Sequence, residues 1–282
     1  MRGGCLGFTS RNREDRATWL HRRQSTIIVE DYTLKKYFGW RRIGFALLAL
    51  IAIAALAAFS LFRYYGAGAP VNPVVAGNTD TVTLMDFAVP PLVKPITPGW
   101  FHVQFLTKPA MQITFGEQQG RASLRCETNG SGSIFGRFTD IDLSAYPILT
   151  WSWLVEVPVV ASAAEDTTAG DDHPVRFLVK FEDSQMAEHY IEIIWSNGKY
   201  KKGEWKIIGD FHHYVAETGD AKSGENTGTW FEENVNLLAL YREATKRNDN
   251  AKLKYIAVFC DTDDTKARSI AYVGKTELNK AM

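Results

Sequence analysis

One stretch of the chain is apolar without interruption. Residues 43–62 (IGFALLALIAIAALAAFSLF) are twenty uncharged residues, nearly all of them hydrophobic. As an α-helix with a rise of about 1.5 Å per residue, this run is roughly 30 Å long, which matches the hydrocarbon core of a bilayer. The run predicts a single transmembrane helix, and it divides the chain into a part before the membrane and a part after it.

After residue 80 the hydrophobic pattern becomes an alternation of period two, which indicates β-strands. The alternation is clearest in four segments: 148–157, 175–182, 189–196 and 229–237. Trp151, Trp153 and Trp195 share strand faces with aliphatic residues, so we place them in the core. Only residues 236–247 have helical spacing. The pattern predicts an all-β fold, an antiparallel jelly-roll-like β-sandwich with one short helix.

The chain therefore divides into four parts. Residues 1–42 form a basic arm, 43–62 the transmembrane helix, 63–80 a linker rich in Gly, Ala and Pro, and 81–282 the β-sandwich domain. Because the leader is far longer than an ordinary signal-peptide n-region, we interpret the apolar run as an uncleaved signal anchor.

The charges of the chain are distributed unevenly about the apolar run. The whole chain has 32 basic and 32 acidic residues, but residues 1–42 have ten basic and four acidic ones, a net charge of +6. Basic flanks stay in the cytoplasm. We therefore expect a bacterial inner-membrane protein with a cytoplasmic N-terminus and a periplasmic C-terminal domain.

Two cysteines, Cys126 and Cys260, lie in strand-like segments of the expected periplasmic domain. A disulfide is permitted in that compartment. The alternative is a pair of buried free thiols, and we take that as the simpler interpretation. No Cys/His spacing indicates a zinc site.

Five short motifs occur in a fixed order along the domain. They are Pro98-Gly99-Trp100, then Tyr146, Pro147, Leu149, Trp151 and Trp153, then Gly170-Asp171-Asp172 with Arg176, then Trp195, and finally the block 261–265 (DTDDT). In this order the chain resembles the bacterial envelope family DUF3047, over roughly residues 84–275. The resemblance implies a fold like that of jelly-roll carbohydrate-binding modules. It implies an architecture more than an activity.

Two acidic clusters are the first candidates for chemistry. Asp171-Asp172-His173 could bind a metal or act in acid–base catalysis, but the cluster lies in a loop before a strand. We favour a structural role, in which the aspartates cap a turn or pair with Arg176. Asp261, Asp263 and Asp264 loosely resemble a calcium loop without the Gly and Glu that an EF-hand requires. We interpret them as a solvated acidic turn, and a structural ion at the ends of the strands is the less favoured alternative.

The remaining polar residues form no catalytic arrangement. His212 and His213 are adjacent, so on a strand their rings point to opposite faces and do not share a metal. The sequence contains no GxSxG, HExxH or phosphate-binding loop. We therefore predict no catalytic residue, no metal site, no cofactor and no enzymatic activity.

The outward faces of three predicted strands offer a binding surface. If these strands share one sheet, their aromatic and charged side chains line one face, which suits a protein partner or a glycan. An ordinary amphipathic sheet exterior is the alternative. The residues concerned are Arg176, Lys180, Tyr190, Glu192, Trp230, Glu232 and Asn234.

The apolar run also bears on function. It is rich in alanine, and Ala54 and Ala58 are four residues apart, a spacing that lets helices pack closely in lipid. The basic arm contains apolar residues, such as Tyr32 and Phe38, that a purely solvated tail does not need.

We therefore predict a non-enzymatic accessory subunit of a larger membrane protein complex. The helix, the arm and the domain would contact other subunits, and the arm would contact anionic lipid. A respiratory or photosynthetic core complex is a candidate host, and nothing indicates nucleic-acid binding. The second hypothesis is a membrane-tethered glycan-binding module, and the third is an enzyme of unknown type.

Overall fold

A computed structural model describes residues 72–160 and 163–281 of the protein. The predicted basic arm, residues 1–42, and the predicted transmembrane helix, residues 43–62, lie outside this part of the chain. Within it, no helix is both long enough and apolar enough to cross a bilayer.

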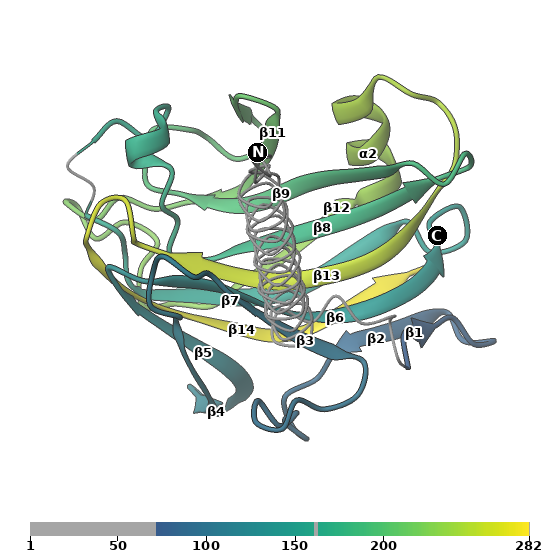
Figure 1. Ribbon diagram of the computed structural model, residues 1–282, viewed down its shortest axis with the longest axis horizontal. Coiled ribbons are helices and arrows are strands. Elements are labelled where there is room, and N and C mark those ends of the chain that lie inside the picture. The colour runs from purple at the N-terminus through teal and green to yellow at the C-terminus, as the bar shows by residue number, and fades with distance from the viewer. Residues whose placement is uncertain (1–71, 161–162, 282) are drawn as a thin grey trace, which may run out of the picture. The chain divides into compact units, whose positions relative to one another are not determined.

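Two β-sheets stack face to face (Figure 1). The larger sheet has eight strands in the order β1-β6-β13-β8-β9-β11-β10, and β3 also pairs with β6. Its strands are β1 (Val74–Val75), β3 (Trp100–Gln104), β6 (Gly132–Asp142), β8 (Arg176–Asp183), β9 (Glu188–Ser196), β10 (Trp205–Ile208), β11 (Phe211–Thr218) and β13 (Ala251–Asp261).

The smaller sheet has six strands in the order β12-β7-β14-β5-β4, and β2 also pairs with β14. Its strands are β2 (Thr81–Met85), β4 (Gln112–Gln118), β5 (Arg121–Asn129), β7 (Ile148–Val157), β12 (Phe231–Asn236) and β14 (Arg268–Asn279). The predicted β-sandwich is confirmed. Two strand pairs, β1 with β6 and β9 with β11, are parallel rather than antiparallel. Alternation along one strand does not reveal the direction of its partner, so the sequence did not predict these pairs.

The predicted short helix is α2 (Leu237–Thr245). The described residues also contain a 3-10 turn at Thr168–Gly170, before β8. Asn236 caps the helix, because its side chain accepts a hydrogen bond of 2.9 Å from the backbone N–H of Ala239. Lys246 ends it in the left-handed conformation, with φ of 57°. The buried face includes Leu237, Leu240 and Tyr241, so the helix packs on the core.

The core between the sheets is rich in aromatic residues. The ring centroid of Trp153 lies 5.2 Å from that of Trp151 and 5.6 Å from that of Trp195. The two contacts are edge-to-face, the geometry that aromatic quadrupoles favour. All three tryptophans are buried, so their predicted place in the core is confirmed.

The fold begins before residue 81. Val74–Val75 pairs with Thr139 and Asp140 of β6, although these valines belong to the predicted linker, residues 63–80. The hydroxyl of Tyr146 donates hydrogen bonds to the carbonyls of Gly77, at 3.1 Å, and Thr79, at 2.6 Å. The β-branched valines pair with an available sheet edge, so part of the predicted linker joins the sandwich.

The interpretation of Cys126 and Cys260 as free thiols is wrong, because the structure joins them in a disulfide. The two residues face each other across the core, Cys126 from β5 and Cys260 from β13, with their Cα atoms 6.6 Å apart. This separation lies within the range that a disulfide spans. The bond links the two sheets and joins residues 134 positions apart.

Candidate functional site

The seven residues predicted to form one binding surface lie on two different sheets. Arg176, Lys180, Tyr190 and Glu192 belong to β8 and β9 of the eight-stranded sheet. Trp230, Glu232 and Asn234 lie just before or within β12, which pairs with β7 in the six-stranded sheet. The expectation of one continuous face is therefore wrong. The alternation gave the face of each strand, but it carried no information on which strands are neighbours.

On the eight-stranded sheet the predicted residues separate further. Lys180 and Tyr190 are accessible, and the Lys180 ammonium lies 2.5 Å from Glu188 and 5.8 Å from the ring centroid of Tyr190. Arg176 and Glu192 are buried instead. They do not belong to an open surface.

Arg176 and Glu192 are part of a row of ionisable side chains that crosses five strands. Arg176 bonds Glu192 at 2.8 Å and also bonds Asp261. Glu192 lies 3.2 Å from His213, which is paired in register with Lys206. All five side chains are buried, so the row crosses the outer face of the sheet beneath a cover.

The cover is the loop before β8, residues 163–175. Asp171 accepts a hydrogen bond from the ammonium of Lys206, and His173 Nε2 lies 2.9 Å from the same ammonium. The other ring nitrogen of His173 lies 2.9 Å from the carbonyl oxygen of Trp195. Since a carbonyl only accepts, Nδ1 carries the proton and Nε2 accepts from Lys206. The loop is thus bound to the sheet by charged groups, in keeping with the structural role predicted for Asp171 and His173. We call the five residues of the row, with Asp171 and His173, the buried charge cluster.

Burial and pairing shift the titration of this cluster. Burial lowers the pKa of His173 to about 4, although the carboxylate of Asp171, 3.6 Å from Nε2, favours the protonated ring. Burial alone would raise the pKa of Glu192, but the charge of Arg176 and the bond from His213 lower it to about 2. Burial and the nearby carboxylates raise the pKa of Asp261 to about 7, despite the charge of Arg176. Pairing therefore keeps Glu192 charged, whereas burial favours the neutral forms of His173 and Asp261.

The acidic residues next to this cluster come close to one another. Asp172, Asp261 and Asp263 present carboxylate oxygens within 4.8 Å of one another. Each already has a donor from the protein: Thr265 for Asp172, Arg176 for Asp261, and Lys108, at 2.7 Å, for Asp263. Two cations already balance the charge that would attract a metal ion. Asp172 also accepts from the backbone N–H of Thr265 at 2.6 Å, so it ties its loop to the turn after β13. Asp261 is buried, so its prediction as a solvated residue is wrong.

The adjacent histidines face opposite sides of β11, as predicted. His213 lies in the buried charge cluster, 3.6 Å from Asp171. His212 contacts the ring of Trp205 with the centroids 6.3 Å apart.

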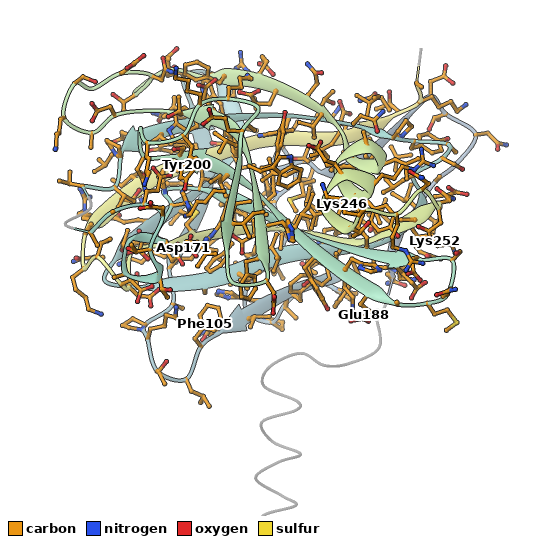
Figure 2. The ribbon with its side chains drawn as sticks, turned by 90° about the horizontal axis from the view of Figure 1, so that it is seen from above. Phe105, Asp171, Glu188, Tyr200, Lys246 and Lys252 are labelled. Carbon is orange, nitrogen blue, oxygen red and sulfur yellow. A yellow bond between two sulfur atoms is a disulfide. The ribbon has the colours of Figure 1, made fainter. Side chains whose placement is uncertain are left out.

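One member of the cluster, Asp171, is labelled in Figure 2. Figure 2 shows Asp171 and Tyr200 toward one end of the molecule, and Lys246, which ends α2, with Lys252 toward the other.

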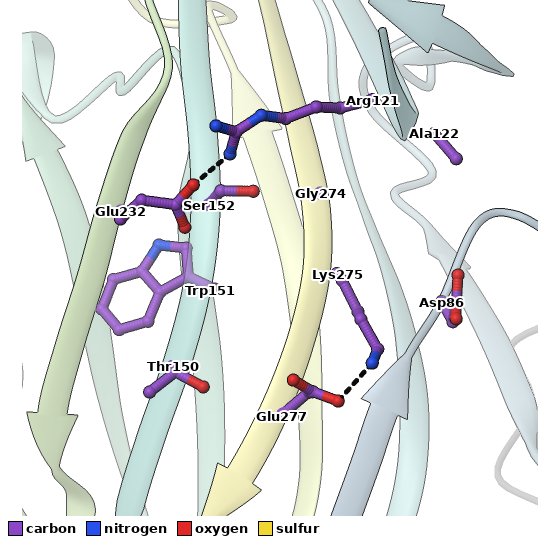
Figure 3. Close-up of a pocket in the computed structure, with 10 residues that line it drawn as sticks. All are labelled: Asp86, Arg121, Ala122, Thr150, Trp151, Ser152, Glu232, Gly274, Lys275 and Glu277. Atoms are coloured by element: carbon purple, nitrogen blue, oxygen red, sulfur yellow. Dashed lines mark hydrogen bonds and ion pairs between the residues drawn. The ribbon is translucent and has the colours of Figure 1, made fainter.

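An accessible groove lies elsewhere, on the outer face of the six-stranded sheet (Figure 3). Its volume is about 370 Å³. Strands β12, β7, β14 and β5 supply its floor and walls. The lining residues are Asp86, Arg121, Ala122, Thr150, Trp151, Ser152, Glu232, Gly274, Lys275 and Glu277.

Charged side chains of the groove form two ion pairs, one between β5 and β12 and one within β14. Arg121 bonds Glu232, and Lys275 lies 2.5 Å from Glu277 (Figure 3). The guanidinium of Arg121 also lies 5.3 Å from the ring centroid of Trp230, which thus stands beside the groove. The groove combines an aromatic edge with hydroxyl, carboxylate and guanidinium groups.

A local irregularity in β14 gives the groove its shape. The register of β14 against β7 shifts between Val273 and Thr276, so Lys275 and Glu277 both turn outward. A Cβ atom on Gly274 would lie 2.3 Å from the hydroxyl oxygen of Ser152. Only glycine leaves that space for Ser152 without a displacement.

Three of the predicted residues, Trp230, Glu232 and Asn234, lie at or beside this groove. Glu232 lines it, and Asn234, which pairs in register with Thr150, lies on the same face of β12. The sequence analysis missed Arg121, which is the partner of Glu232. Arg121 lies on β5 and Glu232 on β12, and these strands come near each other only because β14 and β7 pair between them.

The sequence matches the family described as "Protein of unknown function (DUF3047)" over residues 98–277. The chain belongs to this family. The match includes β3 to β13 and most of β14, so the buried charge cluster lies within the DUF3047 region. The groove also lies within it, except for its lining residue Asp86. The predicted resemblance is confirmed. No curated protein sequence matches the chain.

Several solved structures resemble the DUF3047 sandwich at low identity. The glycoside hydrolase domain of Endo-D from Streptococcus pneumoniae R6 is 9% identical with a TM-score of 0.33, and the match covers 64% of this chain but only 21% of that chain. The xyloglucanase domain of NopAA from Sinorhizobium fredii is 10% identical with a TM-score of 0.38, over 65% of this chain and 94% of that chain. The CBM22-1 xylan-binding domain of Paenibacillus barcinonensis Xyn10C is 14% identical with a TM-score of 0.28, over 66% of this chain and 89% of that chain. These scores are too low to transfer a site to this DUF3047 protein.

Proposed function

We propose that this protein is a non-enzymatic, membrane-tethered periplasmic domain that binds a glycan in the groove of the six-stranded sheet. The observation that carries the proposal is the groove itself. Its volume of about 370 Å³ lies in the range typical of small-molecule sites, and it is rich in hydrogen-bonding side chains beside Trp230. Sugars present many hydroxyl groups and an apolar ring face. The polar side chains of the groove can bond the hydroxyl groups, and Trp230 can stack on the ring face.

The carboxylates of the groove favour binding over hydrolysis. Glycosidases use two carboxyl groups, one of which must stay protonated in a desolvated setting. The Glu232 side chain is 67% exposed and bonded to Arg121, and Glu277 is paired with Lys275. A solvated carboxylate next to a cation is a good hydrogen-bond acceptor and a poor general acid.

Two features support the periplasmic location. The net charge of +6 on residues 1–42 favours retention of that arm in the cytoplasm, which leaves the domain on the other side. The Cys126–Cys260 disulfide suits an oxidising compartment.

The test is a binding assay with defined glycans. The purified full-length protein in detergent is titrated with cellohexaose and with muropeptide fragments of peptidoglycan by calorimetry. We expect one of them to bind, and Glu232→Ala and Trp230→Ala to weaken binding at least about tenfold, or about 1.4 kcal/mol. Glu188→Ala is the matched control, because Glu188 forms a similar ion pair on the other sheet. If binding occurs and the groove variants bind like the wild type, the groove is not the site.

The second candidate is the accessory subunit of a membrane protein complex. The specific observation that favours it is the small-residue spacing of Ala54 and Ala58 in the apolar run, which an inert anchor does not need. Solubilisation of native membranes in a mild detergent, followed by native electrophoresis, tests this candidate. Stoichiometric comigration with other membrane proteins supports it, and migration as an isolated chain contradicts it.

A further inference from the structure

A second surface lies in the loop between β2 and β3, residues 86–99. Three aliphatic side chains project from it into solvent: Val89 is 85% exposed, Leu92 is 61% exposed and Ile96 is 39% exposed. In the stretch 87–98 (FAVPPLVKPITP) the single ionisable residue is Lys94, which is also exposed. Isolated exposed aliphatic residues are ordinary, but three of them on one proline-rich loop with few charges mark a contact surface.

The loop holds these side chains outward in a fixed conformation. The N–H of Leu92 donates to the hydroxyl of Thr97 at 2.7 Å, and the N–H of Thr97 returns a bond of 3.1 Å to the carbonyl of Leu92. Val93 and Ile96 form an isolated β-bridge between these bonds. At the start of the loop, Phe87 is buried against Phe115, with the ring centroids 5.7 Å apart. A loop closed in this way cannot fold its aliphatic residues back onto the core.

The loop ends beside the point where the described chain begins. A Cβ atom on Gly99 would lie 2.3 Å from the carbonyl oxygen of Asn72, so these two residues are in direct contact. Nine residues, 63–71, separate Asn72 from the end of the apolar run at Phe62. Even fully extended, nine residues span only about 30 Å. The loop therefore lies within a short linker's length of the predicted membrane anchor.

We infer that residues 89–96 insert into the interface of the same bilayer that holds the anchor. The inference rests on the membrane tethering in the proposed function and goes beyond it. The chemistry suits a lipid surface, because aliphatic tips enter the acyl boundary while Lys94 meets anionic headgroups. A loop contact of this kind fixes the height and tilt of the sandwich above the membrane. A flexible tether alone does not do so.

The test measures the depth of single labelled positions. The full-length protein with Cys5→Ser is reconstituted into vesicles of phosphatidylcholine and phosphatidylglycerol in a 3:1 ratio. One variant has Leu92→Cys and the control has Met186→Cys, each labelled with a polarity-sensitive fluorophore. Met186 is a matched control because its side chain is 77% exposed on the turn between β8 and β9. We expect nitroxide-labelled lipids to quench residue 92 at least about twofold more than residue 186.

A second variant tests whether the aliphatic residues cause the insertion. A fluorophore at Val89→Cys should lose most of its quenching when Leu92→Asp and Ile96→Asp are added, since these exposed side chains contribute little to folding. Equal quenching at residues 92 and 186 would overturn the inference. A blue-shifted emission at residue 92 without lipid quenching would also overturn it, because a protein partner or a second copy would then cover the loop. Release of the protein from vesicles by alkaline carbonate would instead show that the membrane tethering itself fails.

Discussion

Cys126 and Cys260 join the two sheets of the sandwich through a disulfide between β5 and β13. Both strands lie in the interior of their sheets, with neighbours on each side. The bond therefore links the two halves of the core at residues distant in sequence, and it closes a loop of more than a hundred residues in the unfolded chain.

Loss of this disulfide should lower the stability of the domain. Because the bond restricts the unfolded chain, Cys126→Ser with Cys260→Ser should reduce the free energy of unfolding by about 2–5 kcal/mol. The measurement is the urea midpoint of the protein in detergent, monitored by tryptophan fluorescence. Cys5→Ser is the control, because Cys5 lies in the N-terminal arm. Equal midpoints for the double variant and the control would contradict the prediction.

Arg176 should matter far more to stability than Lys180, although both belong to β8 and both pair with carboxylates. Arg176→Met leaves Glu192 and Asp261 buried without their cation, which should cost about 3–5 kcal/mol. Lys180→Met removes a more accessible pair with Glu188 and should cost at most about 1 kcal/mol. Urea unfolding of the two variants measures both effects. A similar loss in the two would mean that the buried charge cluster is not tightly coupled.

The stability of the domain should depend on pH through this cluster. Burial lowers the pKa of His173 to about 4, below its value in the unfolded chain. The unfolded chain therefore binds a proton that the folded one does not between about pH 4 and 6.5, so this residue makes stability rise with pH there, by up to about 1.4 kcal/mol per pH unit. Asp261 acts oppositely, because its raised pKa of about 7 makes the folded state hold the extra proton.

Two variants separate these opposing contributions. His173→Gln should lower the slope of the free energy of unfolding against pH between pH 4.5 and 6 by about one proton, or about 1.4 kcal/mol per pH unit. Asp261→Asn should raise this slope by a similar amount, since the opposing group is gone. Urea titrations at several pH values give the slopes. If both variants keep the wild-type slope, neither group titrates differently on folding.

The fold was more predictable than the site, and the reason is physical. Alternation depends on each strand by itself, so Trp151 and Trp153 could be placed in the core from the sequence. Whether β12 lies beside β7 or beside β9 depends on long-range pairing, so Glu232 could not be separated from Glu192. Burial of Arg176 depends on a loop that covers an outer face, which no periodicity reveals. The disulfide could not be decided because inward-facing cysteines look alike whether bonded or free.

The proposed topology predicts which end of the protein an externally added protease can digest. If residues 1–42 stay in the cytoplasm, protease added to spheroplasts should reach the domain, residues 72–281, and leave an epitope tag at the N-terminus protected. The measurement is immunoblotting against tags at each end, with lysed cells as the control in which both tags are lost. A C-terminal tag that survives in intact spheroplasts would contradict the periplasmic location.

The apolar run should do more than hold the domain at the membrane, if the protein is a complex subunit. Ala54 and Ala58 are four residues apart, about one turn of the predicted helix, and small residues at this spacing let a neighbouring helix approach closely. Association between helices in lipid depends on packing, because lipid tails are as apolar as the side chains. Replacing both alanines with leucine should therefore weaken association without affecting insertion. Both positions lie outside the described sandwich, residues 72–160 and 163–281, so its folding should not change.

The measurement is copurification in mild detergent, with the stoichiometry of partner proteins determined by gel densitometry. Ala54→Leu with Ala58→Leu should insert normally, keep the folded domain and leave the complex. Leu47→Ile is the control, since it changes the shape of a residue outside the small-residue spacing and should have no effect. If the double variant retains its partners at wild-type stoichiometry, the helix is only an anchor. The hypothesis of a complex subunit would then depend on the basic arm and the sandwich alone.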